Sequence, residues 1–102
     1  MKEEAFKEWM QSLGTMGYRP ISDALSRCRR ISDSLNINLD SEFLKDGGQS
    51  LLSLLEYTSA DAKANKPAPP DLYFKPGANI KNGLASLKAA AKKYFEFCQS
   101  ST

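Results

Sequence analysis

The chain has 102 residues, of which 41% are hydrophobic and 25% are charged, and its formal net charge is +2. This composition is typical of a globular domain rather than a disordered chain, and the length fits a single domain over residues 1–102 without disulfide or metal staples. The apolar runs are too short for a transmembrane helix, and the acidic N-terminus MKEEAFKEW is unlike a secretory signal. We therefore expect a cytoplasmic protein that does not enter a membrane.

The first two predicted elements are amphipathic helices. Phe6, Trp9, Met10 and Leu13 recur at the spacing of one helix face, and the next glycines end that helix. A second helix is expected to open at Pro20, a favoured first-turn residue. Its apolar stripe holds for four turns and consists of Ile21, Ala24, Leu25, Cys28, Ile31 and Leu35.

The middle of the chain predicts shorter elements. Asp40 or Ser41 is expected to cap a short third helix. After the turn at Gly47–Gly48, the run QSLLSLLEY is apolar nearly all round, which predicts a central, well-buried helix. A helical turn is expected over residues 59–65. The prolines at 67, 69 and 70 then favour extended chain.

A last helix is expected from about Asn79 to Gln99, and no strand pattern of any length is present. These elements predict an all-α bundle of four or five helices.

Catalytic signatures are missing from the sequence. It contains no His, no CxxC and no Gly-rich phosphate loop of the GxxxxGK type. Cys28 and Cys98 each fall on the apolar stripe of a predicted helix, so we interpret both as small core residues. We expect no enzyme activity, no metal site and no cofactor.

Charge is distributed unevenly along the chain. Residues 40–61 are acidic, whereas the second and last predicted helices are basic. Guanidinium and ammonium groups suit phosphates, and a solvated helix back with local partners Asp23 and Asp33 is the alternative. The candidate phosphate-binding residues are Arg19, Arg27, Arg29, Arg30, Lys75, Lys81, Lys88, Lys92 and Lys93. If the two basic segments lie side by side, they give the molecule one positive flank.

The connection before the last helix contains the stretch LYFKPG. Tyr73 and Phe74 can stack on bases while Lys75 follows the backbone. The interpretation we favour is that these aromatic residues pin the connection to the core.

Several stretches carry a resemblance to a known family: FKEWM in the first helix, YRPISDALSRCRRISDSLNI in the second and NGLASLKAAAKKYFEFC in the last. The order of elements resembles the N-terminal core-binding domain of tyrosine recombinases and phage integrases, a four-helix SAM-like bundle. The residues in places similar to that family's pattern are Thr15, Tyr18, Leu84, Leu87, Tyr94 and Phe95. The chain is also similar to small helical segments that accompany restriction endonucleases.

The resemblance implies a SAM-like orthogonal bundle of four to five helices whose second and last helices face DNA across a groove. It implies binding alone, because the sequence has no counterpart of the recombinase catalytic domain. The expected function is therefore non-catalytic binding of double-stranded DNA in a mobile-element, recombination or restriction-related protein. The alternative is a protein-interaction adaptor or inhibitor that uses the acidic middle segment or the basic helices. We expect a monomer, or a weak dimer formed through the leucine-rich helix.

Overall fold

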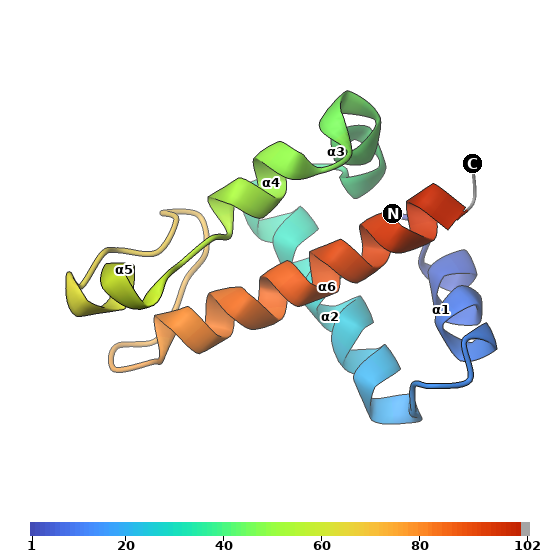
Figure 1. Cartoon of the computed structure of the whole chain (residues 1–102), viewed down its shortest axis with the longest axis horizontal. Helices are drawn as coiled ribbons and strands as arrows, with labels where there is room; N and C mark the ends of the chain where they lie inside the picture. Colours follow the sequence, from blue (N-terminus) through green and yellow to red (C-terminus); the bar gives the residue numbers. More distant parts are fainter. Residues whose placement is uncertain (101–102) are drawn as a thin grey trace.

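The computed structural model of the chain describes residues 1–100, which form six helices and no strand (Figure 1). The helices are α1 (Glu3–Ser12), α2 (Tyr18–Leu35), α3 (Leu39–Asp46), α4 (Gln49–Leu54), α5 (Ser59–Lys63) and α6 (Ile80–Ser100). The all-α bundle is therefore confirmed. The five-residue α5 is the helical turn expected over residues 59–65.

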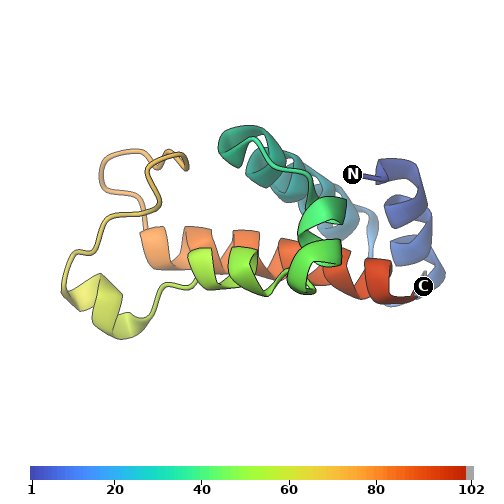
Figure 2. The same ribbon diagram turned by 90° about the horizontal axis from the view of Figure 1, so that it is seen from above.

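Helix α6 is the centre of the bundle, because each of the other five helices contacts it. It crosses in front of α2 in Figure 1, with α3 and α4 above it and α1 near its C-terminal end. The view from above shows α2 on the far side of α6 and α4 running alongside it (Figure 2). The buried residues of α6 are Leu84, Leu87, Ala90, Ala91, Tyr94, Phe95 and Phe97. An apolar face along most of one long helix explains why the shorter helices dock on it.

The contact between α2 and α6 follows the predicted apolar stripe of α2. Its buried residues are Ile21, Ala24, Leu25, Cys28 and Ile31. The Cys28 thiol donates a hydrogen bond to the backbone carbonyl of Ala90, with 3.4 Å between sulfur and oxygen. Small side chains at the contact allow two helices to approach closely. This contact identifies the side of each helix that faces the other.

Two helix starts differ from the sequence prediction. Helix α2 begins at Tyr18, so Pro20 is its third residue. It still lies in the first turn, where a missing N–H leaves no intrahelical bond unmade. Asn38, rather than Asp40 or Ser41, caps α3: its side-chain oxygen accepts hydrogen bonds from the N–H groups of those two residues at 2.8 and 3.2 Å.

The leucine-rich run is not the central buried helix predicted from its sequence. Helix α4 ends at Leu54, whose side chain is 49% exposed, whereas Leu51 and Leu55 are buried. The preceding turn packs directly on α6. Gly48 has φ +85°, and a Cβ atom there would lie 2.3 Å from the ring of Phe95. Glycine is therefore required at the point where α3 turns into α4.

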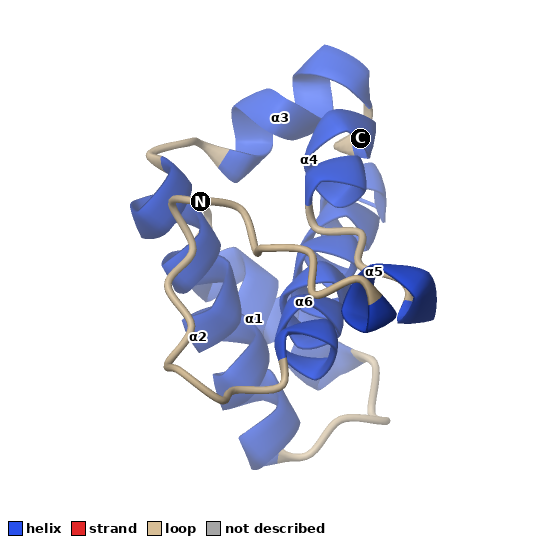
Figure 3. Ribbon diagram, turned by 90° about the vertical axis from the view of Figure 1, so that its left-hand side faces the viewer, coloured by secondary structure: helices blue, strands red, loops and turns tan. Residues whose placement is uncertain are grey.

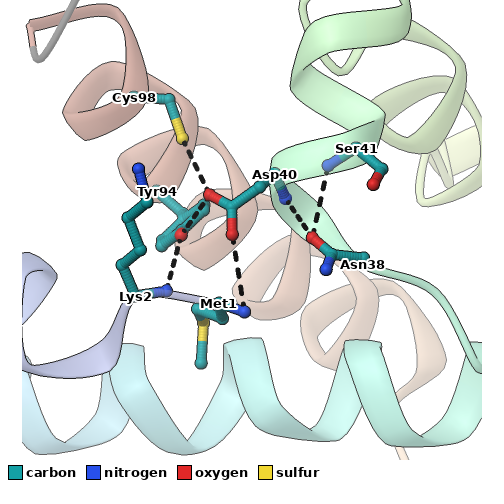
Figure 4. A network of polar contacts seen from close by, with 7 residues as sticks. All are labelled: Met1, Lys2, Asn38, Asp40, Ser41, Tyr94 and Cys98. Carbon is teal, nitrogen blue, oxygen red and sulfur yellow. Dashed lines mark hydrogen bonds and ion pairs between the residues drawn. The ribbon is translucent and has the colours of Figure 1, made fainter.

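Asp40 joins α3 to α6 and to the first residues of the chain (Figure 4). One carboxylate oxygen accepts hydrogen bonds from the Tyr94 hydroxyl at 2.6 Å and from the Cys98 thiol at 3.8 Å. The other lies 3.5 Å from the amino nitrogen of Met1. The Tyr94 hydroxyl also accepts a hydrogen bond from the backbone N–H of Lys2 at 2.9 Å. Burial, and then the hydrogen bond to Asp40, raise the pKa of Tyr94 well above its ordinary value, so this hydroxyl keeps its proton and bridges three segments.

We predict that Tyr94→Phe lowers the free energy of unfolding by about 1.5–3 kcal/mol, since it removes a hydrogen bond to a charged group and leaves the Lys2 amide without its acceptor. Urea unfolding followed by circular dichroism measures the change. Tyr18→Phe is the matched control, because Tyr18 is 85% exposed and should change stability by less than about 0.5 kcal/mol. Equal stability of the two variants would contradict the bridging role of Tyr94.

Candidate nucleic-acid interface

The connection between α5 and α6 is anchored on α2 and on the start of α6. It runs from α5 toward α2 and returns to α6 (Figure 3). Leu72 is buried, and the ring of Phe74 covers Gly83, where an added Cβ atom would lie 2.4 Å from a ring carbon. Arg30 of α2 stacks over the Phe74 ring at 4.8 Å and donates a hydrogen bond to the backbone carbonyl of Tyr73. The expectation that both aromatic residues pin the connection holds for Phe74 and is wrong for Tyr73, whose side chain is 71% exposed.

Four candidate cations lie along one edge of the molecule, which we call the arginine edge: Arg19, Arg27, Arg30 and Lys75. Successive residues of a helix are about 100° apart, so Arg19 and Arg30 project nearly opposite to Cys28, which faces α6. Arg27 lies about 60° from Arg30, toward the anchored connection that carries Lys75.

The charge of the arginine edge is not neutralised by ion pairs within residues 1–100. Arg19, Arg27 and Lys75 are exposed and have no charged partner within 4 Å in that part of the chain. The contacts of Arg30 are to a neutral carbonyl and a neutral ring. The carboxylates of Asp23 on α2 and Asp71 on the connection reduce the local positive charge without cancelling it.

Three other candidate cations form internal ion pairs. Arg29 projects toward α1 and pairs with Glu3, and Lys88 pairs with Glu56 just after α4. Lys93 lies 3.5 Å from Glu96, one turn along α6. These pairs are exposed or half-buried, so each is worth at most about 1 kcal/mol. Their first effect is to lower the positive charge available on those faces.

The two remaining candidates, Lys81 and Lys92, lie on another side of the molecule. Both project nearly opposite to Ala90, the residue of α6 that meets α2. They are exposed and have no ion-pair partner among the described residues. Thus α2 and α6 do lie together, but Arg19 and Arg30 of α2 project away from Lys81 and Lys92 of α6. The expectation of one shared positive flank is corrected accordingly.

An open hollow of about 490 Å³ adjoins the arginine edge. Its lining residues are Arg30, Ser34, Asp71, Tyr73, Phe74, Lys75 and Ala78. Ser34 and Asp71 are not among the binding residues predicted from the sequence, and the sequence does not predict the contact of Arg30 with a segment more than forty residues away. Pairs so distant in the chain leave no periodic signal in one sequence.

Neither cysteine is prepared for nucleophilic chemistry. Burial raises the pKa of Cys28 to about 12. Burial, together with the negative charge of Asp40, raises the pKa of Cys98 to about 11. A thiol reacts through its thiolate, so both groups are poorly reactive near neutral pH. Within residues 1–100, no group of three or more His, Cys, Asp or Glu side chains is placed to hold a metal ion.

Comparison of the chain with protein-family models, curated proteins and solved structures found no match. Over the same described residues, no helix combines the length and the apolar character needed to span a bilayer.

We predict that Phe74→Ala frees the connection without unfolding the bundle, because the ring covers Gly83 and supports Arg30. Native-state hydrogen exchange should speed up at the amides of Leu72 and Ala78, which donate to Pro69 and Lys75. Tyr73→Ala serves as the control and should leave those rates within about two-fold, because its side chain is exposed. Faster exchange throughout α2 and α6 would contradict a local anchoring role.

We also predict that Cys98 reacts with iodoacetamide at pH 8 on the order of ten-fold more slowly than an unperturbed cysteine, since its raised pKa leaves little thiolate. Asp40→Asn should speed this reaction in the folded protein, because it removes a negative charge that disfavours the thiolate. Mass spectrometry of the Cys98 peptide measures the rate. A slower reaction in the variant would contradict the electrostatic contribution of Asp40.

Proposed function

We propose that the chain is a non-catalytic DNA-binding domain that contacts phosphates through the arginine edge. The observation that carries the proposal is the group of unneutralised cations on the outer side of α2 and the anchored connection: Arg19, Arg27, Arg30 and Lys75. Other candidate cations are paired with carboxylates or project from another side. Phosphate oxygens are suitable partners because guanidinium groups stay charged and donate several hydrogen bonds in one plane.

The resemblance to the core-binding domain of tyrosine recombinases supports the same class of partner. It implies that the second and last helices both face DNA. In this chain the unpaired lysines of α6 project away from α2, so we restrict the proposed contact surface to the arginine edge. A place in a mobile element, or in a recombination or restriction-related protein, belongs to this proposal as well.

The test is binding of a fluorescent duplex, followed by anisotropy over a series of salt concentrations. The log of the association constant falls with log salt by about 0.9 for each phosphate neutralised, so four contacts predict a slope of about −3.6. We predict that Arg19→Ala with Arg27→Ala weakens binding and moves the slope toward zero by about 2. Neither side chain forms an ion pair within residues 1–100, so folding should be preserved.

The matched control is Lys81→Ala with Lys92→Ala, which removes the same charge from two exposed, unpaired cations on the opposite side of the helix pair. This variant should keep the slope of the unmodified chain. Equal losses in both double variants would show that net charge, rather than the arginine edge, determines binding. The absence of salt-dependent duplex binding by the unmodified chain would overturn the proposal.

Protein interaction is the second candidate function, and the exposed leucines of the acidic segment favour it. Leu44 of α3 is 82% exposed and Leu54 of α4 is 49% exposed. Glu42, Asp46 and Glu56 lie close to them in the chain. Apolar side chains exposed among carboxylates suit a partner surface with apolar and basic groups. The duplex titration separates the two functions, because a protein that acts only through this segment should not bind the duplex in a salt-dependent way.

A further inference from the structure

We propose that Tyr73 stacks on an unpaired base of DNA. The part of the arginine edge beside Tyr73 then binds single-stranded DNA, in addition to the phosphate backbone of a duplex. The proposal rests on the proposed function, and it adds a second kind of contact to it. Aromatic rings bind single strands because every base has a face on which they stack, while nearby cations follow the phosphates.

Tyr73 is held in place although its side chain is exposed. Its two neighbours in the chain are anchored: Leu72 is 3% exposed, and Phe74 lies between Gly83 and the Arg30 guanidinium. Its own carbonyl accepts a hydrogen bond from Arg30. A ring that is 71% exposed on such a fixed backbone loses little further freedom when a base stacks on it.

The surroundings of Tyr73 fit a nucleotide. Arg30 and Lys75 line the same hollow and carry charges that can meet the phosphates on either side of the stacked base. Ser34 and Asp71 also line it and offer hydrogen-bonding groups to the base edge. An unpaired base leaves both of its faces free, whereas a base within a duplex presents neither face to a side chain.

The other strongly exposed tyrosine lacks this setting. Tyr18 is 85% exposed at the start of α2, where it lines a groove with Lys7 and Arg29 on the side of α1. Arg29 is already paired with Glu3. Tyr18 therefore provides a control with the same ring chemistry, placed outside the hollow that Arg30 and Lys75 line.

The experiment compares an oligothymidine of about 15 nucleotides with an abasic deoxyribose-phosphate strand of the same length, since site sizes for single strands are about 4–16 nucleotides. Both strands carry the same charge, so only the oligothymidine reports stacking. Tyr73→Ala should weaken oligothymidine binding about 5-fold or more and leave the abasic strand within about 2-fold. Tyr73→Phe should retain the affinity, and Tyr18→Ala should behave like the unmodified chain.

The outcomes separate this inference from the proposed function. Unchanged oligothymidine binding by Tyr73→Ala, or an equal loss for both strands, overturns the stacking role. If the abasic strand still binds in a salt-dependent way that Arg19→Ala with Arg27→Ala weakens, the phosphate-binding function stands without it. If the unmodified chain binds neither strand and no duplex, the phosphate-binding function fails and the stacking role fails with it.

Discussion

The close packing of α2 on α6 is the constraint on which the rest of the structure depends. The contact brings Cys28 against the backbone of Ala90, and it leaves the sides of both helices that carry cations facing outward. Two helices that pack through their apolar faces turn their polar backs away from each other. Basic residues on two neighbouring helices therefore cannot be assumed to act together. Arg30 comes close to a further cation, Lys75, because the connection that carries Lys75 docks beside it.

Arg30 has two roles at the anchored connection. Arg30 stacks on Phe74 and donates a hydrogen bond to the carbonyl of Tyr73, which orders a segment that contains four prolines and has no regular structure of its own. Because both partners are neutral, the guanidinium keeps its full charge. Ordering the loop and attracting an anion are thus compatible functions of the same side chain. A carboxylate partner would have offset that charge.

The parts of the fold that follow from local periodicity could be predicted from sequence. The stripe of α2, the extent of α6 and the helical turn at α5 all depend on residue spacing within one element. The partial exposure of α4 could not be predicted, because a run of leucines has the same pattern whether its helix is central or peripheral. Asp40 shows the same limit: the sequence predicts that Asp40 or Ser41 caps a helix, but the partners of Asp40, Tyr94 and Met1, come from the two ends of the chain. The sequence predicts which residue types form the candidate site. It does not predict the side of the molecule toward which each of them projects.

Orientation limits which cations can bind one polyanion more strictly than ion pairing does. An exposed pair such as Arg29 with Glu3 stabilises the fold by at most about 1 kcal/mol, so a phosphate can displace the carboxylate at little cost. No comparable change moves Lys81 or Lys92 to the other side of α6, because that would require the helix to rotate and expose its buried face. Burying one side chain such as Leu84 or Leu87 is worth about 1.5–3 kcal/mol, which makes such a rotation prohibitive. The helix packing therefore limits the binding surface more strictly than the local charge balance does.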